Sequence, residues 1–172
     1  MVTHRRRELA AGHPTASHPA AADELDLRIL AALTAQPETP VKQLAAGLGI
    51  PASTCAFRLR ALRSRGVIAG LRVVIDPAAL GATVQAMIRV RLANHSKSGV
   101  DALFDALVGT PGVLQVFHIA GADDFLVHVA VTDAAALRDI VLEHITVHEV
   151  VRATETQLVF ERREGAGLLP RA

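Results

Sequence analysis

Residues 53–66 read STCAFRLRALRSRG, a stretch that joins a regular apolar repeat to a high density of positive charge. Cys55, Leu59 and Leu62 recur at helical spacing, which predicts a helix with one buried stripe. Between positions 41 and 75 the chain has six basic residues and no Asp or Glu. A short helix with an apolar stripe and an acid-free cationic surface is typical of a helix that enters the major groove of DNA.

Two more helices are predicted just before this one. Residues 23–33 have acids at their start and apolar side chains at helical spacing, and two prolines follow them. Residues 41–48 repeat apolar side chains at the same spacing up to Gly49, which suits a tight turn. Ser53 is the expected N-cap of the third helix. A very short turn holds the last two helices at a steep angle, so this order predicts a helix-turn-helix domain.

The side chains that the third helix directs away from its buried stripe are candidates for contact with DNA. At about 100° per residue, Phe57, Arg60 and Ser64 point most nearly outward. Arg60 can donate two hydrogen bonds to guanine and Phe57 can meet a thymine methyl group, whereas the other three arginines lie nearer the core boundary and suit phosphates. The alternative is a solvated arginine-rich face, which the missing acids disfavour. The predicted DNA-contacting residues are Ser53, Thr54, Phe57, Arg58, Arg60, Ala61, Arg63, Ser64 and Arg65.

Charge divides the chain into two parts. The formal net charge is only +1, but residues 99–164 hold eleven acids against four bases, whereas the part before Asp76 is basic. Such asymmetry predicts one half that faces nucleic acid and one half with another task. The predicted organisation is a disordered tail over 1–22, a helix-turn-helix domain over 23–68, a linker over 69–81, a second domain over 82–164 and a C-terminal tail over 165–172.

Composition indicates a globular chain with aliphatic cores. The 172 residues are 51% hydrophobic but only 3% aromatic. No apolar run approaches the roughly 18 residues that span a bilayer, and the N-terminus lacks the apolar region of a signal peptide, so we expect a cytoplasmic protein that does not enter membranes. Cys55 is the single cysteine and lies on a buried stripe, so we expect a small hydrophobic side chain and no disulfide or metal site.

The second half alternates strands and helices. Residues 84–92 alternate apolar and polar side chains, which predicts a strand with one buried face. The complete set of expected elements is a strand over 84–92, a helix across 100–108, strands over 114–120 and 125–131, a helix across 137–145 and a strand over 154–160. This βαββαβ order predicts a ferredoxin-like antiparallel sheet with both helices on one face. The other face presents Met87, Phe117 and Ile119, and an apolar sheet face of this kind marks an interface.

Motifs across both halves resemble those of the Lrp/AsnC (feast/famine) transcription regulators. The matching runs are Leu25-Asp26-x-x-Ile29-Leu30, Leu48-Gly49-Ile50, Cys55, Arg58-Leu59-Arg60, Leu62, Gly66-Val67-Ile68 and Asp76-Pro77-x-x-Leu80-Gly81. The resemblance covers about residues 23–164 and implies an α+β chain with a winged helix-turn-helix domain and a ferredoxin-like regulatory domain. It also implies three kinds of partner: double-stranded DNA, a small amino acid or related metabolite, and further copies of the chain in a homodimer that can assemble into tetramers or octamers.

The same resemblance places the effector between dimers, near the loop that joins the second and third strands and near the last strand. Gly121 and Asp124 match the family pattern Gly-x-aromatic-Asp, while Asp123 stands where an aromatic residue is usual. An Asp can bind an α-ammonium group, and Thr154 and Thr156 can donate to a carboxylate. Loss of the aromatic residue favours a polar or basic ligand over leucine. The alternative is that Gly121 and Asp124 only shape a turn.

Two other functions fit this architecture. Sirohaem decarboxylases share it and use His and Arg beside a tetrapyrrole. His118 and His128 fall on neighbouring predicted strands, and His144 and His148 have a spacing that can ligate a metal on a helix. No acid–base constellation or nucleotide-binding motif accompanies them, so we expect no enzyme, no cofactor and no metal site. The second alternative is an architectural DNA-binding protein without an effector.

Overall fold

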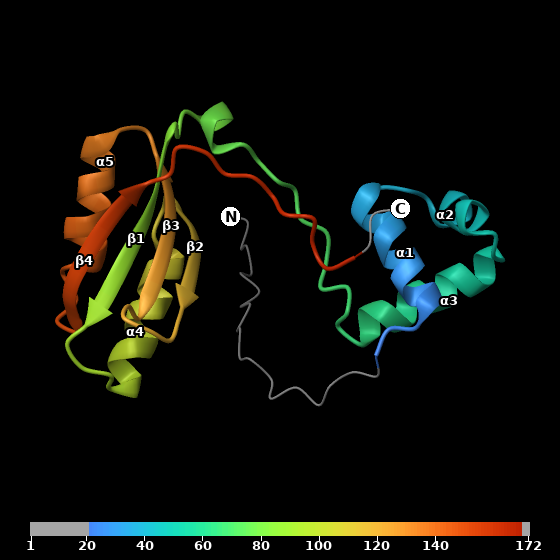
Figure 1. The fold of residues 1–172 in the computed structure, drawn as a ribbon, viewed down its shortest axis with the longest axis horizontal. Helices are drawn as coiled ribbons and strands as arrows, with labels where there is room; N and C mark the ends of the chain where they lie inside the picture. The colour runs from blue at the N-terminus through green and yellow to red at the C-terminus, as the bar shows by residue number, and fades with distance from the viewer. Residues whose placement is uncertain (1–20, 170–172) are drawn as a thin grey trace, which may run out of the picture. The chain divides into compact units, whose positions relative to one another are not determined.

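The computed structural model describes residues 21–169, and the chain divides into two units (Figure 1). The first unit comprises the chain up to Arg72 together with its C-terminal residues, and the second runs from Val73 to Arg163. Of the tail predicted over 1–22, all but the last two positions lie outside the described residues. Within the described part, no helix has the length and apolar character needed to cross a bilayer.

The helices of the first unit are α1 (Glu24–Ala35), α2 (Val41–Leu48) and α3 (Ala52–Ser64). The Asp23 carboxylate caps α1 by accepting the Asp26 N–H at 2.8 Å. Gly49 ends α2 in the left-handed conformation, with a φ of 69°, and residues 50–51 lead directly into α3. The predicted helix-turn-helix is therefore confirmed. The described residues of this unit form no strand.

The start of α3 differs from the prediction. Pro51, not Ser53, is the residue that precedes the helix, and no side chain caps it. The Pro51 ring holds φ at −60° and its nitrogen has no hydrogen to donate. A residue at the start of a helix needs no N–H donor, so proline is well suited to precede the first helical residue. Ser53 consequently lies in the first turn, where it is exposed.

The buried stripe of α3 forms the core of this unit, as predicted. Cys55, Leu59 and Leu62 are almost completely buried. They pack against α1 and α2 through Ile29, Leu44 and Ala45. This packing fixes which residues of α3 remain on its outer surface.

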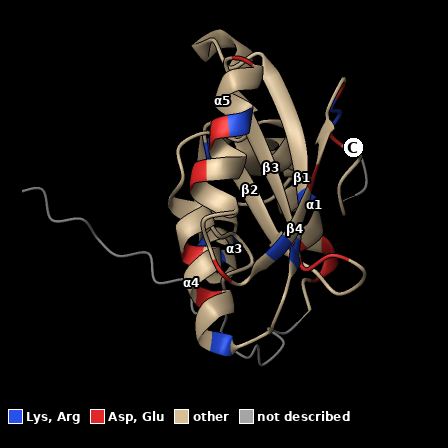
Figure 2. Cartoon of the chain, turned by 90° about the vertical axis from the view of Figure 1, so that its left-hand side faces the viewer, with Lys and Arg blue, Asp and Glu red and all other residues tan. Residues whose placement is uncertain are grey.

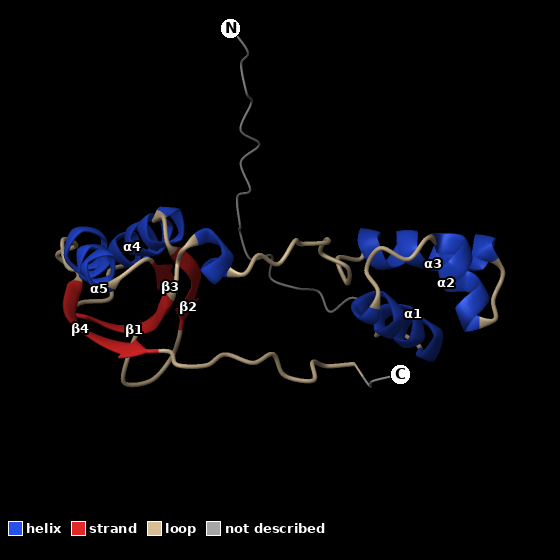
Figure 3. Cartoon of the chain, turned by 90° about the horizontal axis from the view of Figure 1, so that it is seen from above, coloured by secondary structure: helices blue, strands red, loops and turns tan. Residues whose placement is uncertain are grey.

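The second unit is a sheet covered by helices. Its elements are β1 (Val84–Leu92), α4 (Lys97–Gly109), β2 (Val113–His118), β3 (Phe125–Val131), α5 (Ala134–Asp139) with a π-helix (Ile140–Ile145) after it, and β4 (Val151–Leu158), preceded by a 3-10 helix (Pro77–Leu80). The strand order is β2-β3-β1-β4, and all neighbours are antiparallel. Figure 3 shows α4 and α5 together on one side of the sheet. This is the predicted ferredoxin-like arrangement, and the chain as a whole is α+β.

Strand pairing determines one boundary that the sequence pattern does not. β1 and β3 lie where the sequence predicts them, but β2 spans Val113–His118 instead of 114–120, and β4 spans Val151–Leu158 instead of 154–160. β1 is the partner of β4, with Leu92 opposite Val151 and Ala86 opposite Leu158. The length of β1 therefore determines the extent of β4, because backbone pairing continues wherever a partner is available.

The second unit keeps its acids on the outside of its helices. Figure 2 shows acidic residues along α4 and α5. They include Asp101 and Asp105 of α4, which are exposed, as is Glu143 of the π-helix after α5. This surface would repel a polyanion, so it supports the division of tasks predicted from charge.

Candidate nucleic-acid interface and ligand site

The outer surface of α3 presents the residues expected to face DNA. Phe57 has 63% of its surface exposed, and Arg60, Arg63 and Ser64 are also exposed. In the described part of the chain, neither Arg60 nor Arg63 forms an ion pair with an acid. Their guanidinium groups are therefore available for an anionic partner. Thr54 and Ala61, on the flank of the helix, are half-buried.

The other two arginines of the α3 region are bound within the unit. Arg58 Nη1 lies 3.2 Å from Asp26 Oδ1, and Arg65 Nη1 lies 3.2 Å from Asp26 Oδ2. Arg58 also pairs with Asp23. The Asp26 N–H and the Arg58 guanidinium together hold the pKa of Asp23 below its usual value. These arginines thus bind α3 to α1 instead of projecting freely.

The sequence pattern did not reveal that Asp26 is the buried partner of Arg58 and Arg65. Its side chain is only 2% exposed, although acids early in a helix are usually solvated. A usable signal was present, because Asp26 lies one turn before Ile29 on the buried side of α1. A carboxylate at such a position requires a cationic partner, and α3 is rich in arginines.

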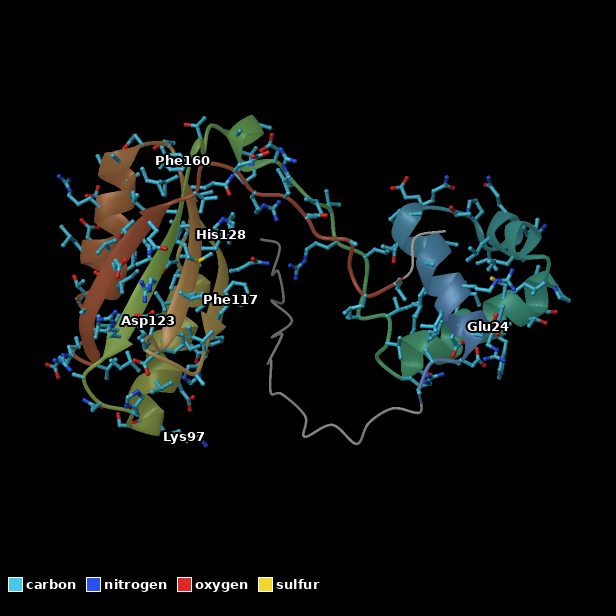
Figure 4. The ribbon with its side chains drawn as sticks, viewed as in Figure 1. Glu24, Lys97, Phe117, Asp123, His128 and Phe160 are labelled. Atoms are coloured by element: carbon cyan, nitrogen blue, oxygen red, sulfur yellow. The ribbon has the colours of Figure 1, made fainter. Side chains whose placement is uncertain are left out.

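Asp123 anchors the β2–β3 loop to β1. Its carboxylate is 7% exposed and accepts hydrogen bonds from Arg89 Nε at 2.6 Å and Arg91 Nε at 2.8 Å. Arg89 also lies 3.2 Å from Glu155 of β4. The bonds from Arg91 and Arg89 hold the pKa of Asp123 below its usual value. Figure 4 labels Asp123 beside these strands. Its negative charge is therefore already balanced by two arginines.

Asp124 fastens the same loop at the end of β1. Its Oδ2 accepts the Leu92 N–H at 2.7 Å, and its Oδ1 lies 2.6 Å from His95 Nε2. Burial opposes ionisation, but the hydrogen bonds from Leu92 and His95 hold the pKa of Asp124 below its usual value. Gly121, with a φ of 148°, provides the turn before this anchor. Asp124 has a structural task whether or not it also meets a ligand.

The predicted ligand residues do not all converge within one subunit. Thr154 and Thr156 are opposite Val90 and Ile88, so they share the side of the sheet that the helices cover. Asp123 is bonded to Arg89, whose side chain points to the opposite face. Asp124 and Thr154 lie at the same end of the sheet, because the Asp124 N–H donates to the Val90 carbonyl.

Comparison with known proteins identifies the family. Residues 23–69 match the winged helix-turn-helix DNA-binding family, and residues 85–166 match the Lrp/AsnC ligand binding domain. The HTH-type transcriptional regulator AldR of Mycolicibacterium smegmatis is 40% identical over 147 residues, which cover 86% of each chain. The chain belongs to the Lrp/AsnC family. It is a DNA-binding transcriptional regulator with an N-terminal helix-turn-helix.

Solved structures of Lrp/AsnC-type regulators share the architecture. The crystal structure of AldR from Mycobacterium tuberculosis superposes with a TM-score of 0.73 at 35% identity, covering 89% of this chain and 100% of the other. A transcriptional regulator from Neisseria meningitidis, solved in complex with L-Met, has a TM-score of 0.78 at 24% identity, covering 87% and 97%. At that identity the Neisseria structure bears on the fold alone.

The histidines of this Lrp/AsnC chain are scattered. His118 stacks on Phe125 with ring centroids 4.6 Å apart, and buried His128 lies 3.1 Å from Gln85 through its Nε2. His144 lies in the π-helix, but the helix ends at Ile145, so His148 does not share a helical face with it. Among residues 21–169, no cluster of three or more His, Cys, Asp or Glu could hold a metal ion.

Proposed function

We propose that this regulator reads DNA with the outward side chains of α3 and that its DNA affinity responds to a small amino acid bound by the second unit. Phe57, Arg60 and Ser64 would meet base edges, with Thr54 and Ala61 on the flank. Arg63 and Ser53 would contact phosphates. The observation that carries this assignment is that Arg60 and Arg63 are exposed without an acidic partner in the described residues, while Arg58 and Arg65 are bonded to Asp26. We therefore exclude Arg58 and Arg65 from the residues proposed to contact DNA.

The experiment for DNA reading is footprinting on the region upstream of the regulator's own gene. Purified protein should protect a two-fold symmetric site, because a dimer supplies two copies of α3. Excess unrelated DNA should not abolish the protection at physiological salt. Contacts to base edges add binding free energy to that of the sequence-independent phosphate contacts. Protection that disappears under such competition would contradict sequence-specific reading.

The ligand proposal rests on the match of residues 85–166 to a ligand-binding domain. A small amino acid would bind beside Gly121 and Asp124, with Thr154 and Thr156 donating to its carboxylate. Asp123 would hold the loop and not touch the ligand, because its carboxylate is bonded to two arginines. The proposed preference for a polar or basic ligand over leucine rests on the absence of the usual aromatic residue at position 123, which the ion pairs of Asp123 leave unchanged.

Calorimetry with a panel of amino acids tests the ligand proposal. Heat of binding to the full chain, together with a change in DNA affinity, is the expected result for at least one amino acid. If no amino acid of the panel gives a heat of binding and the DNA affinity is unchanged, the protein is instead an architectural DNA-binding protein without an effector.

We further propose a homodimer formed through the sheet face without helices. Phe117 is 44% exposed on that face, and Met87 is half-buried there without a covering helix. We also propose that these dimers assemble into tetramers or octamers and that the protein is cytoplasmic. We infer that the chain is not an enzyme; a preparation that is coloured and binds sirohaem would contradict this.

A further inference from the structure

Asp26 of α1 and Asp23, which caps that helix, hold Arg58 of α3 and Arg65, the residue that follows α3. Asp26 accepts from Arg58 through Oδ1 and from Arg65 through Oδ2, each at 3.2 Å. Arg58 is shared with Asp23. The two arginines are seven positions apart, so they lie two helical turns apart on the same side of the helix. One buried carboxylate thus binds both ends of the stretch that carries Arg60 and Arg63.

These ion pairs compete with DNA for the same guanidinium groups. A phosphate that took Arg58 or Arg65 would remove one of the two cationic partners of the Asp26 carboxylate, which is costly because Asp26 is only 2% exposed. Arg60 and Arg63 carry no such restraint in the described residues. The four arginines are therefore chemically alike but differ in their availability to phosphate.

Availability matters because non-specific affinity follows the number of phosphates that a protein neutralises. A helix with four free arginines would bind any DNA sequence more tightly. The discrimination between an operator and bulk DNA would fall accordingly, because phosphate contacts carry no sequence information.

We propose that Asp26, assisted by Asp23, withholds Arg58 and Arg65 from the DNA backbone and thereby sets the ratio of specific to non-specific binding. Asp26 is in this sense a specificity-determining residue that does not touch DNA. The inference rests on the proposed DNA-reading surface of α3.

Salt titrations of Asp26→Asn test the proposal. Asparagine keeps the shape of the side chain but removes the charge that holds the arginines. The slope of log K against log salt on unrelated DNA should become steeper by up to about 0.9 for each arginine released. The ratio of operator to unrelated affinity should fall. Glu24→Gln is the matched control, because Glu24 is an exposed acid of the same helix without an ion pair to α3; its slope should stay near that of the wild type.

A folded Asp26→Asn protein with the wild-type slope and ratio would overturn the proposal. So would a parallel loss of affinity for both DNAs at an unchanged slope, which is the behaviour expected of a purely structural residue. Circular dichroism verifies that the variant is folded.

Arginine variants provide an independent test should Asp26→Asn not fold. Arg58→Gln should leave the salt slope unchanged, because Arg58 is bonded to acids. Arg63→Gln should reduce it by about 0.9. An equal reduction in both variants would show that Arg58 reaches phosphate and would overturn the proposal. No reduction in Arg63→Gln, with Arg60→Ala also like wild type, would instead refute the proposed DNA surface.

Discussion

Arg60 and Arg58 are two positions apart on one helix, yet their environments differ. The buried stripe of Cys55, Leu59 and Leu62 sets the direction of every other side chain of α3. Arg58 is turned toward α1 and its acids, whereas Arg60 is exposed. A difference of two residues rotates a helical side chain by about 200°, which is enough to place one arginine on the exposed surface and the other in an internal ion pair.

Replacing Arg60 should affect sequence discrimination. Arg60→Ala should weaken operator binding by about 1–3 kcal/mol and relax the base preference at one position of each half-site, because a two-bond contact to guanine is lost. Arg63→Ala should weaken all sequences similarly. Fluorescence anisotropy on the operator and its single-base variants measures both effects. Wild-type affinity for Arg60→Ala at physiological salt would show that the DNA surface is assigned wrongly.

The acid stability of the second unit should depend on Asp123. Arg91 and Arg89 hold its folded-state pKa below the usual value of 3.8. A carboxyl group with a lowered pKa stabilises the fold above the unfolded pKa, and this stability is lost as pH falls through the folded pKa. Asp123→Asn should therefore lower the melting temperature at neutral pH, and its deficit should shrink as the pH falls below about 4. Scanning calorimetry at several pH values measures this deficit.

Asp101→Asn is the control for this effect, because Asp101 is exposed on α4. Its melting temperature should follow that of the wild type at every pH. A deficit in Asp123→Asn that stays constant from neutral to acid pH would mean that the charge of Asp123 does not contribute.

At the scale of elements, local patterns predict most of the chain. Alternation over 84–92 and the apolar repeat of α3 predict β1 and the buried face of α3, because each depends only on residues close in sequence. Asp26 and the start of β4 depend on distant partners. Arg58 and Arg65 are 32 and 39 positions from Asp26, and β4 takes its extent from β1. The predicted ligand residues do not all converge for a similar reason, since strand register places Thr156 opposite Ile88 on the helix-covered face, whereas Asp123 is bonded to Arg89 of the other face.

The β2–β3 loop should couple ligand binding to stability. A ligand at 100 times its Kd stabilises the fold by about 2.7 kcal/mol if the unfolded chain does not bind it. Asp124→Asn should remove most of this gain while the dimer persists. Asp133→Asn is the matched control, because asparagine also caps a helix N-terminus and Asp133 caps α5. Melting curves with and without the amino acid measure the gain; an unchanged gain in Asp124→Asn would show that Asp124 only shapes the turn.

At the scale of the whole molecule, the second unit has its own core and should fold without the first unit. Its buried cluster is formed entirely by residues 86–145. A fragment that begins at Gly81 should therefore fold and dimerise without the helix-turn-helix. Met87→Lys should disturb the dimer, because it places an ammonium group in an apolar sheet interface. Analytical ultracentrifugation distinguishes the two states, and a well-folded monomer for the unmodified fragment would refute the interface.

A single measurement of DNA affinity tests the proposed roles of both units together. The affinity of the full chain for the region upstream of its own gene is measured by anisotropy, with and without an amino acid that raises its melting temperature. We expect the amino acid to change the affinity of the wild type, Arg60→Ala to bind the operator more weakly by about 1–3 kcal/mol, and Asp124→Asn to bind DNA but no longer respond. A wild-type protein that binds the amino acid yet shows the same DNA affinity and the same assembly state with and without it would contradict the account.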